Sequence, residues 1–149
     1  MLYLSIPCTP PRSTSQSRTR AAMTKRGPRF YKKIPADWSR FLRQVEHRLR
    51  VASLTAGAFQ VREAKAVALV LTVAYPWPSG TSKASAAGEA YRTTKPDADN
   101  LAKAIVDLLA ECSVIPPDQR VAHLTVIKLN SPNPRLEIRA TSASLMRSE

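Results

Sequence analysis

Along the first half of the chain, hydrophobic and polar residues follow two different periods. Residues 2–6 (LYLSI) alternate between the two kinds, which predicts a half-buried strand. From Asp37 onward, apolar residues return every three or four positions, which predicts an amphipathic helix. Asp37 suits the N-cap of this helix and Gly57 suits its end. The apolar stripe of the helix consists of Trp38, Phe41, Leu42, Val45 and Leu49.

The second half of the chain adds three strands and one helix. Residues 64–75 (AKAVALVLTVAY) are apolar on both faces, which favours a central strand covered on both sides, with a buried helix as the alternative. Residues 100–112 (NLAKAIVDLLAEC) predict a second amphipathic helix. Residues 121–130 and 135–140 predict a β-hairpin joined through SPNP. The order strand, helix, strand, helix, strand, strand predicts an α+β fold with two layers, in which two helices pack on one mixed sheet.

Length and composition indicate one domain over residues 1–149, because 149 residues with 44% hydrophobic content can bury a real core. Within it, residues 11–35 predict a basic loop, residues 76–96 a flexible loop, and residues 141–149 a disordered tail. The longest apolar run, residues 66–75, is too short to cross a membrane, and the N-terminus does not resemble a signal peptide. The two cysteines have neither disulfide-framework nor zinc spacing, which favours a reducing cytoplasm.

Positive charge is concentrated in the N-terminal third. The chain has a formal net charge of +12, and its first fifty residues hold 12 Lys and Arg against 2 Asp and Glu. A basic segment interleaved with Ser, Thr and Gln suits a surface that binds nucleic-acid phosphates. The alternative is a basic tail that only keeps the protein soluble. The residues predicted to contact DNA are Arg12, Arg18, Arg20, Lys25, Arg26, Arg29, Lys32, Lys33 and Lys95.

Acidic residues are scarce, yet two of them stand one residue apart in KPDADNLAKAIVDLL (95–109). If the chain stays extended through Asp99, then Asp97 and Asp99 point to the same side. This interpretation requires the helix to begin at or after Asp99, since two helical residues at this spacing diverge by about 200°. The alternative is helix capping, for which one aspartate is enough. Asp118 returns shortly after the helix and adds a third carboxylate.

Carboxylates held close together repel one another unless a cation lies between them. Oxygen ligands suit magnesium or manganese, and such an ion can activate water and stabilise charge on a phosphoryl group. Lys103 follows Asp99 by four residues, so it can reach the scissile phosphate or the attacking water. The alternative for Lys103 is an exposed ion pair with Asp107, worth only about 0.3–0.5 kcal/mol.

The stretches KPDADNLAKAIVDLL and PPDQRVAHLTVIK resemble the motifs of the RusA-type endodeoxyribonucleases, small enzymes that resolve four-way (Holliday) DNA junctions. The resemblance covers most of the chain and is most specific over residues 95–128. It implies that Asp97, Asp99 and Asp118 are catalytic residues that hold Mg²⁺, with Mn²⁺ as an alternative, and that Lys103 is catalytic at the phosphate.

The resemblance also implies a homodimer that nicks two strands of a branched DNA symmetrically, in DNA recombination and repair, with no membrane and no small-molecule cofactor. The chain departs from the family in two places. Pro117 stands where the family usually has the first of two adjacent acids, and Arg120 stands where the family usually has Gln before the valine. Two other interpretations stay open. One is a non-catalytic basic nucleic-acid-binding protein, and the other is an inactive, prophage-derived resolvase homologue.

Overall fold

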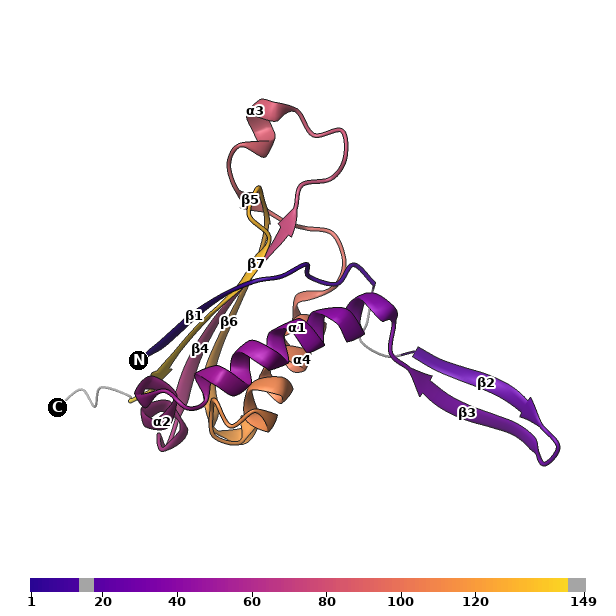
Figure 1. The fold of residues 1–149 in the computed structure, drawn as a ribbon, viewed down its shortest axis with the longest axis horizontal. Coiled ribbons are helices and arrows are strands. Elements are labelled where there is room, and N and C mark those ends of the chain that lie inside the picture. Colours follow the sequence, from indigo (N-terminus) through magenta and orange to yellow (C-terminus); the bar gives the residue numbers. More distant parts are fainter. Residues whose placement is uncertain (14–17, 145–149) are drawn as a thin grey trace.

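The computed structural model describes residues 1–13 and 18–144, and for residues 18–21 and 30–33 it describes the backbone alone. In this part of the chain, five strands form one sheet in the order β1-β7-β4-β6-β5 (Figure 1). β4 and β6 are parallel, and the other neighbouring strands are antiparallel, so the sheet is mixed. The strands are β1 (Leu2–Pro7), β4 (Val67–Pro76), β5 (Ala90–Tyr91), β6 (Val121–Ser131) and β7 (Arg135–Ser142).

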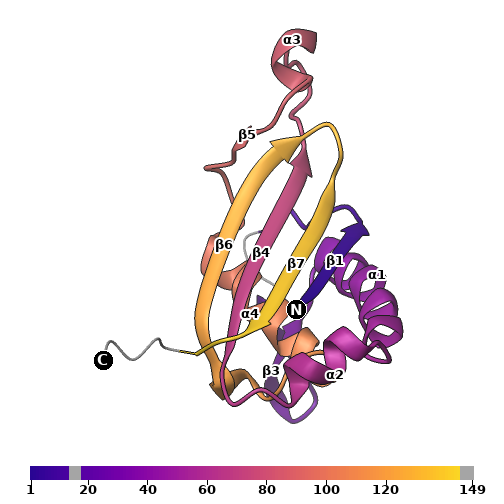
Figure 2. The ribbon, with the colours of Figure 1, turned by 90° about the vertical axis from the view of Figure 1, so that its left-hand side faces the viewer.

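Three helices cover one face of the sheet, and Figure 2 shows the opposite face free of helices. They are α1 (Ala36–Ala52), α2 (Ala56–Arg62) and α4 (Ala98–Glu111). A short helix, α3 (Lys83–Ala86), lies apart from them beyond the end of the sheet (Figure 1). The predicted α+β class, with two layers and a mixed sheet, is confirmed. No helix in the described residues is long and apolar enough to cross a membrane.

The core lies between the sheet and the two long helices. On β4, alternate residues from Val67 to Val73 are fully buried. The expectation that this strand is covered on both sides is wrong, because Ala68, Val70 and Thr72 lie on the helix-free face (Figure 2) and are only partly buried. The apolar stripes of both helices face the fully buried residues of β4 and are buried as predicted, except that Leu42 is only partly buried. Each fully buried Leu or Ile stabilises the fold by about 1.5–3 kcal/mol, so this packing holds α4 against the sheet. The buried stripe residues are Trp38, Phe41, Val45 and Leu49 on α1, and Leu101, Ile105, Leu108 and Cys112 at α4.

The predicted hairpin of the last two strands is wrong, because β4 lies between β6 and β7 and pairs with both. The connection from Ser131 to Arg135 passes the end of β4, where Pro76 is opposite Ser131 and Ala74 is opposite Arg135. β4 is apolar on both faces, so the middle of the sheet, with a strand on each side, suits it better than an edge does.

The predicted basic loop over residues 11–35 is also wrong, since most of it forms an antiparallel hairpin of β2 (Arg18–Thr24) and β3 (Gly27–Lys33). The hairpin projects away from the rest of the molecule (Figure 1). The Thr24 hydroxyl donates to the carbonyl of Gly27 at 2.7 Å, and Gly27 adopts a φ of 103°, which favours glycine. Residues 22–26 at its outer end are exposed, so no hydrophobic alternation there reveals the hairpin in the sequence.

The predicted caps of the first helix are wrong. Pro35 occupies the N-cap of α1, and Asp37 lies in its first turn. Gly57 does not end this helix but lies within α2, whose N-cap is Thr55. A Cβ atom at position 57 would lie 3.1 Å from the carbonyl oxygen of Met1. Glycine at this position therefore permits the close approach of α2 to β1.

Two predicted irregular segments contain regular structure. The predicted flexible loop over residues 76–96 includes α3 and β5, and β5 pairs with β6 through Ala90 and Tyr91. The predicted tail over residues 141–149 begins inside β7, because pairing with β4 continues to Ser142. Residues 145–149 lie outside the described part of the chain.

Candidate active site

The start of α4 carries the acidic motif. Asp97 is the N-cap residue with extended backbone angles (φ −70°, ψ 150°), and Asp99 lies in the first turn. The expectation that the helix begins at or after Asp99 is therefore wrong by one residue. Pro96 constrains the residue before it and not Asp97, so the helix can begin directly after Asp97. The Lys95–Pro96 peptide bond is cis.

Asp97 does not act as a side-chain cap. Within the described residues its carboxylate makes no capping hydrogen bond, although its carbonyl accepts the first helical bond from the amide of Leu101 at 3.2 Å. The side chain is 56% exposed and lies 3.9 Å from the ammonium of Lys95. Capping therefore does not explain why an aspartate occupies this position.

The predicted site residues Asp99, Lys103 and Asp118 line one open hollow of about 420 Å³. Asp118 reaches it from the 3₁₀ turn η1 (Asp118–Arg120), which follows Pro117 and leads directly into β6. The packing of α4 and η1 thus brings together acids that are 19 positions apart in the sequence. Asp107 also lines the hollow, and its carboxylate is 3.2 Å from the ammonium of Lys103. The apolar wall of the hollow consists of Ala102, Val106, Val121 and Leu124.

The predicted trio of carboxylates is not fully assembled. Asp97 is not among the residues that line this hollow. Over the part of the chain that the structure describes, no three His, Cys, Asp or Glu side chains come close enough to hold one metal ion. The donor set nevertheless fits magnesium, because this ion is usually bound by one or two carboxylates, with water and substrate phosphates as its other ligands. Asp99 and Asp118 would supply these carboxylates.

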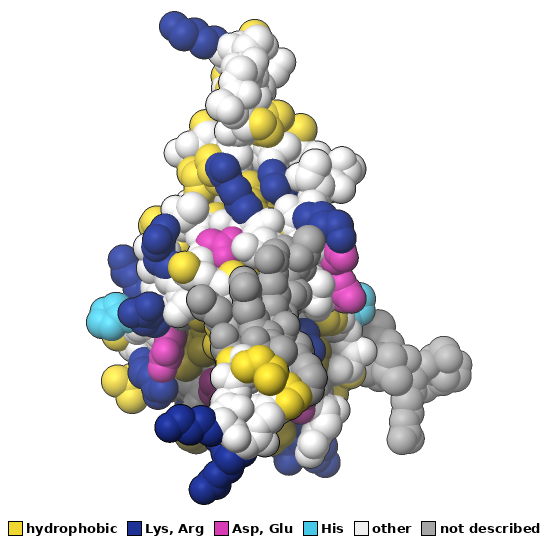
Figure 3. Space-filling view, turned by 90° about the vertical axis from the view of Figure 1, so that its right-hand side faces the viewer, with side chains coloured by type: hydrophobic (Ala, Val, Ile, Leu, Met, Phe, Trp, Pro, Cys, Tyr) yellow, Lys and Arg dark blue, Asp and Glu magenta, His cyan; other side chains and the backbone are white. Residues whose placement is uncertain are grey.

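A second, larger hollow of about 510 Å³ lies near the base of the hairpin and has a different character. It is lined by Arg40 and Arg43 of α1 together with Ile34, and it contains no carboxylate. Such a hollow suits a phosphate group but not a metal ion. Figure 3 shows Lys and Arg side chains gathered over the face from which the hairpin projects, with fewer acidic ones.

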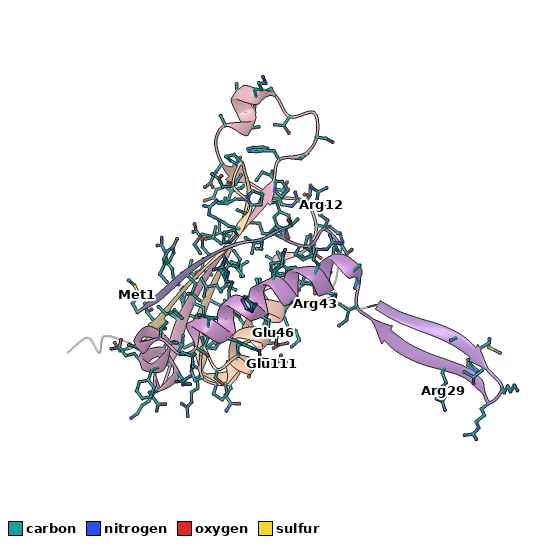
Figure 4. All side chains as sticks on the ribbon, in the orientation of Figure 1. Met1, Arg12, Arg29, Arg43, Glu46 and Glu111 are labelled. Carbon is teal, nitrogen blue, oxygen red and sulfur yellow. The ribbon has the colours of Figure 1, made fainter. Side chains whose placement is uncertain are left out.

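The predicted DNA-contacting residues lie in separate places. Lys25, Arg26 and Arg29 are exposed near the outer end of the hairpin (Figure 4), whereas Arg12 lies near the start of α1. Lys95 is exposed beside Asp97. The side chains of the other four predicted residues lie outside the described part of the structure, and they are Arg18, Arg20, Lys32 and Lys33.

Asp37, which the sequence presented as a cap, joins the base of the hairpin segment to α1. One carboxylate oxygen accepts from the amides of Arg12 and Ser13, both at 2.8 Å. The other accepts from the hydroxyl of Ser13 at 2.9 Å and from the amide of Trp38 at 3.0 Å. Burial alone would raise the pKa of Asp37, but these hydrogen bonds outweigh it and lower the pKa below its ordinary value.

Sequence reasoning missed two cations that contact the segment before Asp97. Arg92 and Lys128 donate hydrogen bonds to backbone carbonyls of residues 94–96. A lysine in a strand usually faces solvent, so nothing in the local pattern around Lys128 indicated this role.

A family model described as Endodeoxyribonuclease RusA matches residues 9–141, which is most of the chain. This match includes the hairpin, α4, η1 and β6, and it confirms the resemblance that the two acidic motifs indicated. No curated protein matches the chain.

Proposed function

This chain belongs to the RusA endodeoxyribonuclease family, and on that premise we propose that it is a magnesium-dependent endonuclease that resolves four-way DNA junctions. The observation that carries this proposal is the hollow in which Asp99 and Asp118 lie with Lys103. Two carboxylates and an ammonium around one open hollow suit phosphodiester hydrolysis, and the net charge of +12 suits a DNA substrate.

Each side chain has a proposed role. Asp99 and Asp118 would hold the ion, and Asp97 would turn toward it as a third ligand, leaving its long contact with Lys95. When bound, magnesium or manganese activates a water molecule and stabilises the charge that develops on the phosphate. Lys103 is 70% exposed at the rim, where it would bind a phosphate oxygen in place of Asp107.

Resolution of a junction requires two strands of like polarity to be nicked. One active site can cut only one strand. We therefore propose a homodimer that places two active sites on one branched DNA. Paired symmetric nicks leave ligatable duplexes, which suits a role in recombination and repair. The projecting hairpin, with Lys25, Arg26 and Arg29 exposed near its end, would bind the phosphates of a DNA arm.

A second candidate is a non-catalytic DNA-binding homologue, such as an inactive prophage-derived copy. The observation in its favour is that no three metal-ligating side chains converge in the described residues. Pro117 also favours this candidate, because the family usually has a further acid at this position.

A cleavage assay separates the two candidates. A synthetic four-way junction and a linear duplex of the same sequence are each incubated with the protein in Mg²⁺, in Mn²⁺ and in EDTA. We expect paired nicks at symmetric positions in the junction alone, in either metal, with none in EDTA. Asp97→Asn should lose cleavage and retain junction binding, whereas Glu111→Gln, which alters an exposed acid at the far end of α4, should cut normally. Tight junction binding without cleavage in either metal would support the non-catalytic candidate.

A further inference from the structure

Two cations hold the backbone that leads into the acidic motif. The ammonium of Lys128 donates to the carbonyls of Thr94 at 2.8 Å and Pro96 at 2.7 Å. The guanidinium of Arg92 donates to the carbonyl of Lys95, which lies between them in sequence, at 2.9 Å. Three successive carbonyls are therefore bound by charged donors, whose hydrogen bonds are stronger than those of neutral groups.

These cations are themselves anchored to the centre of the sheet. The guanidinium of Arg92 stacks on the ring of Tyr75, 4.2 Å from its centroid, and Tyr75 is fully buried in β4. Arg92 also donates to the side chain of Asn130 at 3.2 Å, and its amide donates to the carbonyl of Lys128 at 2.8 Å. Lys128 and Asn130 both belong to β6, so the contacts extend from two rigid strands to the irregular segment before α4.

The arrangement has an electrostatic cost. Burial lowers the pKa of Lys128, the neighbouring Arg92 lowers it further, and only Asp97 acts in the opposite direction. Burial likewise lowers the pKa of Arg92. Two like charges side by side are unfavourable unless the groups that they bind offset the cost, as the three carbonyls do here.

The position of these contacts links them to the acids. Pro96, whose carbonyl Lys128 binds, directly precedes Asp97, and Asp97 begins the helix that carries Asp99. Residues 92–97 belong to no helix or strand, and the side-chain bonds from the two cations, together with the backbone bond from Arg92 to Lys128, tie this segment to the sheet. A change at Lys128 would therefore reach Asp97 and the first turn of α4 through the backbone.

We propose that Lys128 and Arg92 are positioning residues of the active site, which set the direction of Asp97 and of the first turn of α4. This inference rests on the proposed nuclease function. Residues that orient metal ligands without contacting the metal typically contribute about 10–100-fold to metal affinity or activity. The proposed contribution is of this kind, and it needs no contact between Lys128 and DNA.

The test compares Lys128→Met with Lys65→Met, which removes the same charge from an exposed lysine just before β4. For both variants we would measure single-turnover junction cleavage, junction affinity, thermal unfolding, and hydrogen exchange at the amides of residues 97–101. We expect Lys128→Met to cut about 10–100-fold more slowly than Lys65→Met, with equal junction affinity and faster exchange over these residues. Lys128→Arg, which keeps the charge and several donors, should recover much of the lost rate.

Several results would overturn the proposal. Wild-type cleavage in Lys128→Met would do so, and so would slower cleavage with unchanged exchange, because Lys128 would then act on the DNA itself. If the wild-type protein cuts no junction, the nuclease function fails, and hydrogen exchange over residues 97–101 in Lys128→Met alone decides the positioning role. Exchange unchanged from the wild type then refutes this role, and faster exchange supports it. If Lys128→Met does not fold, Arg92→Lys is measured in the same way, since it keeps the charge but loses the planar fork that reaches Asn130 and the carbonyl of Lys95.

Discussion

Replacement of Asp37 by alanine should separate the hairpin segment from the body of the protein. The carboxylate accepts four hydrogen bonds of 2.8–3.0 Å, three of them from Arg12 and Ser13, which are at least 24 positions away in sequence. The fourth comes from the amide of Trp38, whose indole also donates to the carbonyl of Ser13 at 3.1 Å. The loss of one carboxylate thus leaves the amides of residues 12 and 13 without their acceptor.

The expected loss in the free energy of unfolding follows from these hydrogen bonds. A hydrogen bond to a charged group contributes about 1.5–3 kcal/mol when buried, but water can replace part of each bond at this half-exposed site. We therefore expect Asp37→Ala to lower the free energy of unfolding by about 2–4 kcal/mol in total. For a chain of this size each kcal/mol corresponds to about 2–4 °C, so the melting temperature should fall by about 5–15 °C.

Thermal unfolding followed by circular dichroism measures this effect, with Glu46→Ala as the control. Glu46 is also a carboxylate of α1 with a short contact, 2.6 Å to Arg50, but that pair is exposed and should contribute little. The contribution of Asp37 is present above the ordinary aspartate pKa of 3.8 and is lost as the pH falls through its lowered pKa, so wild type and Asp37→Ala should converge in acid. Equal melting temperatures for Asp37→Ala and Glu46→Ala at neutral pH would refute the reasoning.

Two further predictions concern the proposed DNA chemistry. Lys103→Ala should slow junction cleavage about 100-fold without a change in melting temperature, whereas Asp107→Ala should cut normally. Full activity of Lys103→Ala would show that Lys103 has no catalytic role and only forms an exposed ion pair with Asp107. The double change Lys25→Ala and Arg26→Ala should weaken junction binding and reduce the slope of log affinity against log salt by about 2, because two phosphate contacts are lost. An unchanged slope in a fluorescence titration would show that the end of the hairpin does not contact DNA.

The elements that bury an apolar face could be predicted from the sequence. The stripes of α1 and α4 and the central position of β4 were correctly identified, because each must meet the core at fixed spacing. The expected cover on both faces of β4 is wrong, since the described helices pack on one face alone (Figure 2). The β2–β3 hairpin could not be found in this way, since the exposed residues 22–26 at its end bury no apolar face. The insertion of β4 between β6 and β7 depends on pairing across the whole sheet, which local patterns do not encode.

The candidate site shows the same division. Asp99, Lys103 and Asp118 were predicted together and do line one hollow, because an amphipathic helix fixes two of them and the turn after it returns the third. Asp97 was grouped with them from its spacing and from the family resemblance. It is not among the residues that line the hollow, and the helix begins one residue earlier than that spacing required. The contacts of Lys128 with the segment before Asp97 join parts of the chain more than 30 positions apart, so no local motif could indicate them.

The central claim is that Asp99 and Asp118 share one divalent ion, and metal binding tests it most directly. Mn²⁺ is titrated into the protein bound to a four-way junction that carries non-hydrolysable linkages around its branch point, and free Mn²⁺ is followed by electron paramagnetic resonance, with the junction alone as background. The account predicts that Asp99→Asn and Asp118→Asn each lose the same protein-dependent binding event, while Glu111→Gln retains it. Wild-type Mn²⁺ binding in either Asp99→Asn or Asp118→Asn would contradict the account.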